Sequence, residues 1–327
     1  MTRHRALVTA PFGGKGLEHL QTVMDVVLDP WIDHRPMRVL DGDGLLALVR
    51  HHQADVVIAE ADFVMGSIID EGGLWAIGST RGDPTNVDVA GATAKGIPVL
   101  HTPGRNADAV AEITVALLLA AARRIIPADR DLRASQVFRD GTVPYQRFRG
   151  REINGRTAGL VGFGAIGRAV AWRLEGLGMR VLSFDPFASD ASHTDLHQML
   201  RECDVVSMHA AITPDTMHMM GATEFAVMRD DAIFVNAARA GLADLDALTA
   251  ALVDGKLAAA AIDHFDGEQL APGHPLIGMD NVVLTPHIGG ATYETEMNHS
   301  RMIANDLAAL AAGRRPEHIV NPDVLDA

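Results

Sequence analysis

The chain has 327 residues, a length that favours two domains over a single core. With 48% hydrophobic and 21% charged residues, the composition is that of a packed globular protein and excludes a disordered chain. The formal net charge of -14 argues against nucleic-acid and anionic-membrane partners, because both require a basic face. A single cysteine, Cys203, excludes an intramolecular disulfide and fits a reducing cytoplasm, which is the predicted location.

The chain shows no segment that predicts membrane targeting. The apolar run after the first five residues is too short for a secretory signal. The longest uninterrupted apolar run, residues 115–122, is too short to span a bilayer. We therefore expect no membrane partner.

The first part of the chain alternates between strand-like and helix-like segments. Short apolar runs typical of buried strands occur at residues 6–8, 55–58, 74–77 and 97–100. A strongly helical stretch over residues 109–124 follows, and cations near its end suit the helix dipole. This pattern predicts a first α/β unit and then a connecting helix.

A second series of strands and helices follows this helix. Its strand candidates are residues 158–161, 180–184, 204–208, 232–235, 259–262 and 282–284. Strands that alternate with helices predict a parallel, doubly wound sheet. A last helix over residues 297–312 would rejoin the first unit, which would make that unit discontinuous in sequence.

A glycine-rich turn joins the first strand of this second series to a helix. The turn is Gly162-Phe163-Gly164-Ala165-Ile166-Gly167. In a dinucleotide site the first glycine permits a tight turn and the second lets the backbone approach the pyrophosphate. The third glycine lets helix and strand pack closely, while the helix N-terminus attracts the anion. The turn therefore predicts a dinucleotide cofactor.

An acidic residue follows the next predicted strand. Asp185 lies 18 residues after Gly167, where a carboxylate would bind the adenosine ribose hydroxyls and repel a 2′-phosphate. The spacing predicts NAD as the cofactor in preference to NADP. The alternative is that Asp185 only caps the turn at Pro186.

Three polar residues follow strands of the second series, and ligands in open α/β sheets bind at the carboxyl ends of strands. They are Arg239, Glu268 and His287. Reduction of a 2-keto acid needs a cation for the substrate carboxylate and carbonyl, and an acid that protonates the oxygen. We predict Arg239 as the cation, His287 as the acid and Glu268 as its partner. In the reverse reaction His287 would be the base.

The chain resembles the D-2-hydroxyacid dehydrogenase family over nearly its whole length. The resemblance rests on the glycine turn and on segments 103–106, 109–112, 236–241, 263–268 and 285–290. It implies the same roles for Arg239, Glu268 and His287, and a nicotinamide carboxamide contact for Asp263. Further cofactor contacts are implied in this family pattern for His209, Ala237, Ala238, Gly289 and Gly290, beside the turn residues.

The resemblance also implies a domain organisation. A Rossmann NAD-binding domain, residues 105–294, would be inserted into a flavodoxin-like substrate domain made of residues 1–104 and 295–327. Members of the family are usually homodimers, so a homodimer is expected. The substrate would be a small 2-keto or 2-hydroxy acid.

Two positions depart from the usual family pattern. Gln269 stands where the family mostly has proline, and related formate dehydrogenases use glutamine in place of the catalytic glutamate. The segment from Asp263 to His287 matches without a gap, so we keep Glu268 as the partner of His287. The second departure is His264, where an apolar residue is usual, and we interpret it as a packed histidine. Other histidine pairs lack ligands at convincing spacing, and no metal is predicted.

The substrate loop is expected at residues 78–84, where the family binds the substrate carboxylate with backbone amides. Its candidate residues are Thr80, Arg81 and Gly82. Arg81 would pair with a phosphate on the substrate or with a surface carboxylate, and Arg105 could also bind a phosphate. Asn106 is either a hinge residue that touches substrate or the N-cap of the following helix.

Two other functions remain open at this point. The same fold also serves corepressors that sense NAD, so a nucleotide-sensing binding protein is one alternative. A formate or phosphite dehydrogenase is the other.

Overall fold

The computed structural model describes residues 3–326, and the chain divides into two compact units. Unit 1 comprises Met1–Asn106 and Thr292–Ala327, and unit 2 comprises Ala107–Ala291. These bounds put Arg105 and Asn106 in unit 1, whereas the sequence-based division placed them in the cofactor domain. Within residues 3–326, no helix is both long and apolar enough to cross a membrane.

Unit 1 contains a five-stranded parallel sheet in the order β2-β1-β3-β4-β5. The strands are β1 (Arg5–Val8), β2 (Asp25–Leu28), β3 (Val56–Ala59), β4 (Ala76–Ser79) and β5 (Val99–Leu100). The helices are α1 (Gly14–Val23), α2 (Gly42–His52), α3 (Ser67–Glu71), α4 (Val89–Ala94) and α12 (Tyr293–Ala311). The order is that of flavodoxin-like sheets, and it reverses direction at β1.

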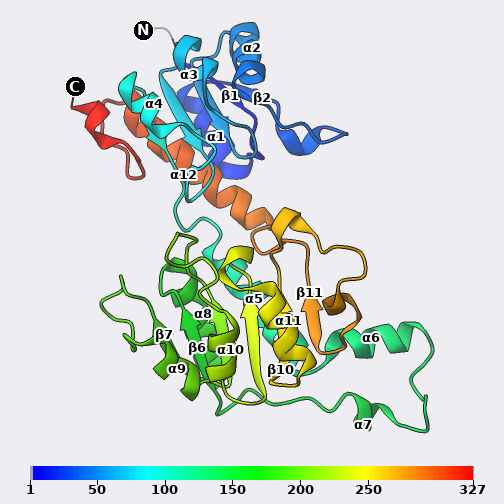
Figure 1. The fold of residues 1–327 in the computed structure, drawn as a ribbon. Coiled ribbons are helices and arrows are strands. Elements are labelled where there is room, and N and C mark those ends of the chain that lie inside the picture. The colour runs from blue at the N-terminus through cyan, green and yellow to red at the C-terminus, as the bar shows by residue number, and fades with distance from the viewer. Residues whose placement is uncertain (1–2, 327) are drawn as a thin grey trace. The chain divides into compact units, whose positions relative to one another are not determined.

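Helix α12 joins the C-terminal part of the chain to unit 1 and lies against α1 (Figure 1). The two helices pack closely at Gly16, where an added Cβ would lie 2.4 Å from the backbone carbon of Ser300. Ile303 and Leu307 are fully buried in the same core as Val8 of β1. The discontinuous unit predicted from the sequence is therefore held together by apolar burial.

Unit 2 contains a six-stranded parallel sheet in the order β11-β10-β9-β8-β6-β7. The strands are β6 (Thr157–Val161), β7 (Arg180–Phe184), β8 (Val205–Met208), β9 (Ala232–Asn236), β10 (Leu257–Ile262) and β11 (Val282–Leu284). The helices are α5 (Ala107–Ala122), α6 (Ile125–Arg133), α7 (Pro144–Arg147), α8 (Ala165–Gly176), α9 (Leu196–Glu202), α10 (Ala222–Val227) and α11 (Leu245–Val253). The topological switch point of this sheet lies between β6 and β8.

The sheet of unit 2 has a hydrophobic core on each face, as the alternation of strands and helices predicts. One core includes Phe225 and Phe234, whose rings meet edge to face with centroids 5.2 Å apart. The other is formed by α5 and α8 against the sheet, with Leu118 and Val170 buried. Both faces are covered, which explains why the strands read as continuous apolar runs.

The structure also shows where sequence patterns misplaced an element. Strand β2 was not predicted, because it is an edge strand with no fully buried residue and begins at the exposed Asp25. Helix α12 begins at Tyr293, four residues before the predicted start at residue 297. The earlier start is explained by Thr292, whose Oγ1 accepts a hydrogen bond from Thr295 N at 3.1 Å.

Candidate active site

The glycine turn lies at the switch point of unit 2, between β6 and α8. Gly162 has φ +96°, and a Cβ there would lie 2.5 Å from Ala210 N, so only glycine fits. A Cβ on Gly167 would lie 2.3 Å from Gly162 O. By contrast, a Cβ on Gly164 would meet no atom within 4 Å. Gly162 and Gly167 thus shape the turn, whereas the space at Gly164 is open.

Asp185 follows β7 and holds two backbone amides. Its Oδ2 accepts a hydrogen bond from Phe163 N at 2.8 Å, and its Oδ1 accepts one from Phe187 N at 2.8 Å. The predicted turn-capping contact is therefore present, and the carboxylate is also tied to the glycine turn. Both contacts leave the carboxylate beside the cofactor loop, so ribose binding stays a proposal.

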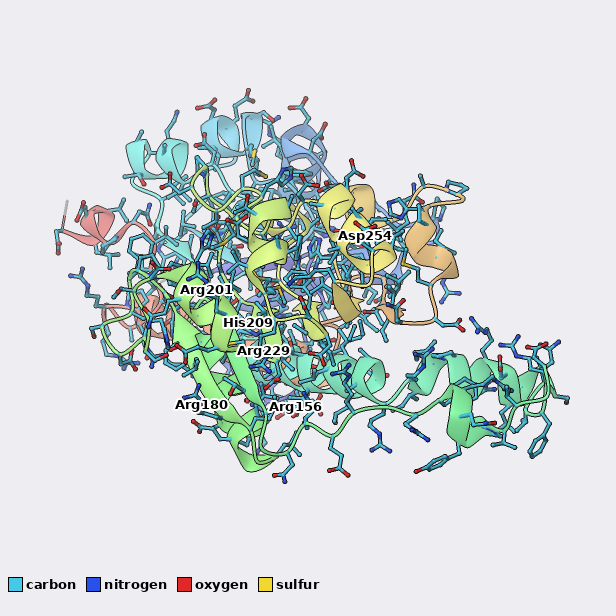
Figure 2. All side chains as sticks on the ribbon, turned by 60° about the horizontal axis from the view of Figure 1, so that its bottom comes forward. Arg156, Arg180, Arg201, His209, Arg229 and Asp254 are labelled. Atoms are coloured by element: carbon cyan, nitrogen blue, oxygen red, sulfur yellow. The ribbon has the colours of Figure 1, made fainter. Side chains whose placement is uncertain are left out.

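His209 follows β8, and its backbone lies against Gly162 of the glycine turn. Figure 2 labels His209 among the side chains of unit 2. Burial lowers the pKa of His209 to about 4, so the imidazole is neutral at physiological pH. Its Nε2 shares a hydrogen bond with the Ser207 hydroxyl at 2.9 Å. Its Nδ1 is buried and has no partner among the residues that the structure describes.

The turn fits a dinucleotide. Helix α8 begins with Ala165 and Ile166, and N–H groups in the first turn of a helix have no acceptor within that helix. The space beside its N-cap residue, Gly164, is open. The orphaned Nδ1 of His209 offers a further polar contact at the same edge of the sheet. These features are compatible with a dinucleotide bound at this edge of the sheet.

A histidine and a carboxylate form the chemical centre of unit 2. His287 Nδ1 donates a hydrogen bond to the Glu268 carboxylate, with distances of 2.9 Å to Oε1 and 3.0 Å to Oε2. Both side chains are accessible, with 43% of His287 and 57% of Glu268 exposed. The hydrogen-bond partner of His287 is thus Glu268 and not the neighbouring Gln269, as the match to the family pattern without a gap predicted.

The backbone at both residues is unusual. His287 has φ +53° and Glu268 has φ +60°, in the left-handed region that non-glycine residues rarely adopt. Such conformations cost of order 1–3 kcal/mol each and persist where the surroundings impose them, often at functional sites. The local strain is therefore consistent with side chains that are held in place for chemistry.

Asp263, which directly follows β10, imposes the conformation of the His287 loop. Its side chain is buried, and its two oxygens accept hydrogen bonds from Thr285 Oγ1 at 2.6 Å, Ile288 N at 2.9 Å and Gly289 N at 2.8 Å. Its backbone oxygen accepts from His287 N at 2.7 Å. Gly289 is required here, because an added Cβ would lie 2.9 Å from the Asp263 carboxylate. Gly290 follows it in the same loop.

Arg239 is carried by a loop that starts at the end of β9. The buried Asn236 holds this loop, since its Nδ2 donates to Arg239 O at 2.9 Å and its Oδ1 accepts from Ala238 N at 3.1 Å. Ala237 lies between them. The guanidinium is exposed and donates to Ala238 O at 2.7 Å. Asn236 is a positioning residue that was not predicted as a site residue, although it lies in the segment 236–241 on which the resemblance rests.

His264 lies closer to the chemical centre than the sequence suggested. Its ring packs on that of His287, with centroids 3.7 Å apart and planes inclined by 41°. Burial, followed by the His287, Glu268 and Arg239 charges, shifts the pKa of His264, and the net shift is downward. The interpretation as a packed histidine therefore omitted its main contact, which is with the predicted acid.

The donor atoms of His264, Glu268 and His287 all lie within 4.8 Å of one another. Such a set has the residue types that bind divalent transition metals. Two of these three side chains, His287 and Glu268, are already hydrogen-bonded to each other. The absence of a resident metal stays a prediction.

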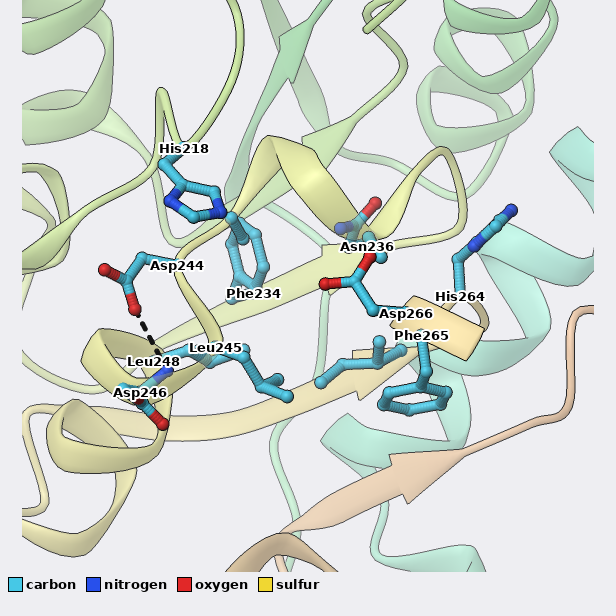
Figure 3. A pocket seen from close by; sticks show the side chains of 13 residues that line it. His218, Phe234, Asn236, Asp244, Leu245, Asp246, Leu248, His264, Phe265 and Asp266 are labelled. Atoms are coloured by element: carbon cyan, nitrogen blue, oxygen red, sulfur yellow. Dashed lines mark hydrogen bonds between the residues drawn. The ribbon is translucent and has the colours of Figure 1, made fainter. Parts of the chain in front are cut away.

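A cavity of about 200 Å³ lies beside this centre (Figure 3). Its lining combines apolar side chains such as Phe234 and Phe265 with Asn236, His264 and several aspartates. The carboxylate of Asp244 is already used, because it caps α11 by accepting from Asp246 N at 3.0 Å. The cavity shares Asn236 and His264 with the site described above.

The predicted substrate residues lie in unit 1. Thr80 is fully buried and its N–H donates to Ala59 O at 3.0 Å, while Gly82 O accepts from His101 Nδ1 at 2.8 Å. Arg81 Nε donates to Glu60 O at 2.7 Å, and a terminal nitrogen donates to Thr85 Oγ1 at 3.2 Å. Asn106 is the last residue before α5.

Arg105 is already engaged by unit 1. Its guanidinium forms an ion pair with Glu60 at 2.7 Å and donates to His299 Nδ1 at 2.8 Å. Glu60 and His299 were not predicted as site residues from the sequence. Neither residue belongs to a motif, so no local signal pointed to them.

Comparisons with known proteins bear on the family of this chain. Residues 115–289 match the D-isomer specific 2-hydroxyacid dehydrogenase, NAD binding domain family. The chain is 36% identical over 340 residues to a glyoxylate reductase of Thermofilum pendens, covering 99% of this chain and 96% of that protein. Among solved structures it is similar to the TT0316 protein from Thermus thermophilus, with 34% identity, coverage of 97% and 99%, and a TM-score of 0.83.

A further solved structure bears on the cofactor. The NADPH-dependent glyoxylate/hydroxypyruvate reductase of Sinorhizobium meliloti is 25% identical, with coverage of 98% and 99% and a TM-score of 0.79. The chain belongs to the D-isomer specific 2-hydroxyacid dehydrogenase family. It is an NAD(P)-dependent oxidoreductase that acts on the CH–OH group of a 2-hydroxy acid.

Proposed function

We propose that this enzyme interconverts a small 2-keto acid and the D-2-hydroxy acid, with His287 as the acid and base. The hydrogen bond between His287 Nδ1 and Glu268 carries the proposal. It leaves Nε2 as the nitrogen that can exchange a proton with the substrate oxygen. The carboxylate fixes the ring orientation and stabilises the imidazolium, as in other paired histidines.

Arg239 would bind the substrate carboxylate and polarise the carbonyl. Its guanidinium is exposed at the carboxyl edge of the sheet, and its charge acts on His264, which packs on His287. A guanidinium fork can hold a carboxylate through two hydrogen bonds. A bound nicotinamide dinucleotide would supply the hydride for the carbonyl carbon. His287 protonates the oxygen as its negative charge develops.

For the cofactor we propose NAD in preference to NADP. The Asp185 carboxylate stands beside the glycine turn, where it would repel a 2′-phosphate. Arg168, the nearest cation on α8, is paired with Asp190 at 2.7 Å and packs over the Phe163 ring. In this structure the Arg168 guanidinium is thus occupied by the Asp190 carboxylate. Equal kcat/KM for NADH and NADPH would contradict this assignment.

On the substrate side we propose that the loop of Thr80, Arg81 and Gly82 binds the substrate carboxylate through backbone groups. The Thr80 N–H, which donates to Ala59 O at 3.0 Å, holds the start of this loop at the end of β4. Asn106 stays a proposed hinge or substrate residue. In the same scheme unit 1 is the substrate domain and unit 2 the cofactor domain.

The proposed assembly is a homodimer. Within unit 2, α6 and α7 extend away from the sheet in both Figure 1 and Figure 2. This segment exposes large apolar side chains, namely Ile125, Ile126, Leu132, Phe138 and Tyr145. Exposed apolar groups of this kind mark interaction surfaces. Light scattering after size-exclusion chromatography should give twice the chain mass, and Leu132→Asp should reduce it.

The experiment that tests the activity is NADH oxidation with glyoxylate and hydroxypyruvate. We expect turnover with at least one of them, and we expect the product to have the D configuration. NADH binding without turnover of any 2-keto acid would instead favour the NAD-sensing binding protein. Oxidation of formate or phosphite in place of 2-hydroxy acids would favour the second alternative.

A further inference from the structure

The sheet of unit 1 has its own topological switch point, between β1 and β3. In open α/β sheets, ligands bind outside the carboxyl ends of the strands at such a point. Glu60 immediately follows β3, and Pro11 lies three residues after the end of β1. Arg105 and His299 connect these two loops through the contacts described below.

Arg105 is the centre of this cluster. One of its terminal nitrogens donates to Glu60 Oε1 at 2.7 Å, and the other donates to His299 Nδ1 at 2.8 Å. The side chains of Arg105 and Glu60 are only 16% and 18% exposed. Burying an ion pair is seldom favourable for stability alone, because desolvation offsets the attraction between the charges. A pair of this kind at a switch point therefore suggests a role in binding.

The protonation state of His299 follows from its contacts. Nε2 donates to Pro11 O at 2.7 Å, so Nδ1, which accepts from Arg105, carries no proton. Burial, followed by the Arg105 charge, lowers the pKa of His299 to about 4. The cluster thus contains one cation and one anion, and the Arg105 charge is balanced by Glu60.

The surroundings of the cluster are acidic. Burial raises the pKa of Glu296, and the nearby charges of Glu60 and Asp33 add to this effect. A phosphate dianion at this position would face these carboxylates, while Arg105 is already neutralised. Uncharged hydroxyl groups are not repelled by these carboxylates. A carboxylate can accept hydrogen bonds from a vicinal diol, as it does from a ribose.

Trp31 adds an aromatic side chain to the same cluster. Its indole Nε1 donates to Glu60 Oε2 at 3.3 Å, so it binds the carboxylate oxygen that Arg105 does not contact. Carboxylate, guanidinium and indole together offer acceptors, donors and an apolar face. This combination suits a polyhydroxylated chain, whose C–H and O–H groups alternate.

We propose that Glu60, Arg105 and Trp31 form a subsite for the hydroxylated, unphosphorylated tail of the 2-keto acid substrate. This inference rests on the proposed function and narrows it to polyhydroxy acids. It also replaces the prediction that Arg105 is a phosphate clamp.

The test compares kcat/KM for four 2-keto acids with the intact enzyme. They are glyoxylate, which has no tail, hydroxypyruvate, its 3-phosphate, and a four-carbon 2-keto acid with two hydroxyl groups. We expect the dihydroxylated acid to be the best substrate and the phosphate ester to be worse than hydroxypyruvate by at least about tenfold. Preference for the phosphate ester would overturn the subsite.

Variants then locate the selectivity. Glu60→Gln should lower kcat/KM for the dihydroxylated acid by at least about tenfold more than for glyoxylate. The matched control is Glu71→Gln, which removes an exposed carboxylate whose ion pair with Arg50 has the same 2.7 Å length. The control should leave the ratio of the two substrates unchanged. An equal fall for both substrates in Glu60→Gln would overturn the subsite.

A second variant tests the subsite even if Glu60→Gln does not fold. Trp31→Phe leaves both members of the ion pair in place and removes the indole N–H together with part of the aromatic surface, and it should shift the same substrate ratio to a smaller extent. If Glu60→Gln does not fold, an unchanged ratio in Trp31→Phe overturns the subsite. Absence of turnover with all four acids contradicts the proposed function itself, and the subsite with it, whereas turnover without discrimination contradicts the subsite alone.

Discussion

Each unit places a histidine at the carboxyl edge of its sheet, and the two histidines differ in every property that matters for chemistry. In unit 2, 43% of the His287 side chain is exposed, and its partner is the carboxylate of Glu268. In unit 1, only 2% of His299 is exposed, and its partner is the guanidinium of Arg105. The first environment leaves the imidazole accessible and hydrogen-bonded to a carboxylate, whereas the second buries the ring and keeps it neutral. The residue type alone therefore says little about its role.

The same contrast holds for the arginines. Arg239 is exposed and its loop is held by Asn236, so its guanidinium is available to a ligand. Arg105 is largely buried and already has an anionic and a neutral partner. We infer that unit 2 supplies the reactive groups, and that unit 1 supplies a preformed polar surface that selects among substrates.

The largest effect should come from His287→Gln. Loss of the acid and base should lower kcat by about 10²- to 10⁴-fold, because positioned proton transfer contributes that much to catalysis. Steady-state kinetics together with NADH fluorescence titration would check the result, and NADH affinity should change little. The control is His51→Gln, an exposed histidine at the end of α2. Retained turnover in His287→Gln would remove the assignment of the acid.

The buried histidines should make both units sensitive to acid. The pKa values of His209 in unit 2 and His299 in unit 1 are lowered to about 4 from 6.5. Below pH 6.5 the unfolded chain binds protons that the folded chain does not, so the free energy of unfolding decreases as the pH falls towards 4. The slope should reach about 1.4 kcal/mol per pH unit for each histidine.

Thermal unfolding between about pH 7 and about pH 4.5 would measure this dependence. In His299→Gln the amide can still donate to Pro11 O and accept from Arg105, so the fold should be retained. The dependence of Tm on pH should then be weaker than in the wild type. A variant with an unchanged dependence would show that His299 titrates normally.

Two glycines of the turn should have different roles, Gly162 in folding and Gly164 in cofactor binding. Gly162→Ala should lower the free energy of unfolding by about 1–3 kcal/mol, because it combines a positive φ with a backbone clash. Gly164→Ala meets no atom within 4 Å, so it should leave Tm unchanged and weaken NADH binding by about tenfold. Thermal unfolding and NADH titration of both variants would check this. Weakened folding in Gly164→Ala would contradict the division of roles.

The smallest effect is expected at Asp185. Asp185→Ser should lower the preference for NADH over NADPH by about tenfold, since the repulsion of the 2′-phosphate is lost. The matched control is Asp195→Ser, another aspartate of unit 2 that accepts a backbone hydrogen bond, in this case from Gln198 N at 2.9 Å. Comparison of kcat/KM for the two cofactors would check both variants. An unchanged ratio in Asp185→Ser would assign that residue to the turn alone.

The sequence predicted the centre of unit 2 because its residues occur in short contiguous motifs. The segments from Asn236 to Arg239 and from Asp263 to Glu268 each lie at the end of a strand, so strand ends and residue types are enough to bring them to one edge. The contact between His264 and His287 was missed, because ring packing depends on the loop conformations that the Asp263 hydrogen bonds impose.

The cluster of unit 1 could not be predicted in the same way. Trp31, Glu60, Arg105 and His299 come from four separate segments, and no spacing in the sequence relates them. Only the packing of α12 on α1 brings His299 to the loop after β1. The strand pattern predicted the sheet of unit 1, apart from the edge strand β2, but not which side chains meet at its edge.

The insertion of unit 2 into unit 1 has a consequence for biosynthesis. When the ribosome has made residue 291, the segment that forms unit 2 is whole, whereas unit 1 still lacks α12. Ile303 and Leu307, which fill the core beside β1, are then not yet part of the chain. Because domains tend to fold as units during translation, we expect the second unit to fold first. The N-terminal strands would remain without their covering helix, and accessible to chaperones, until α12 has been synthesised.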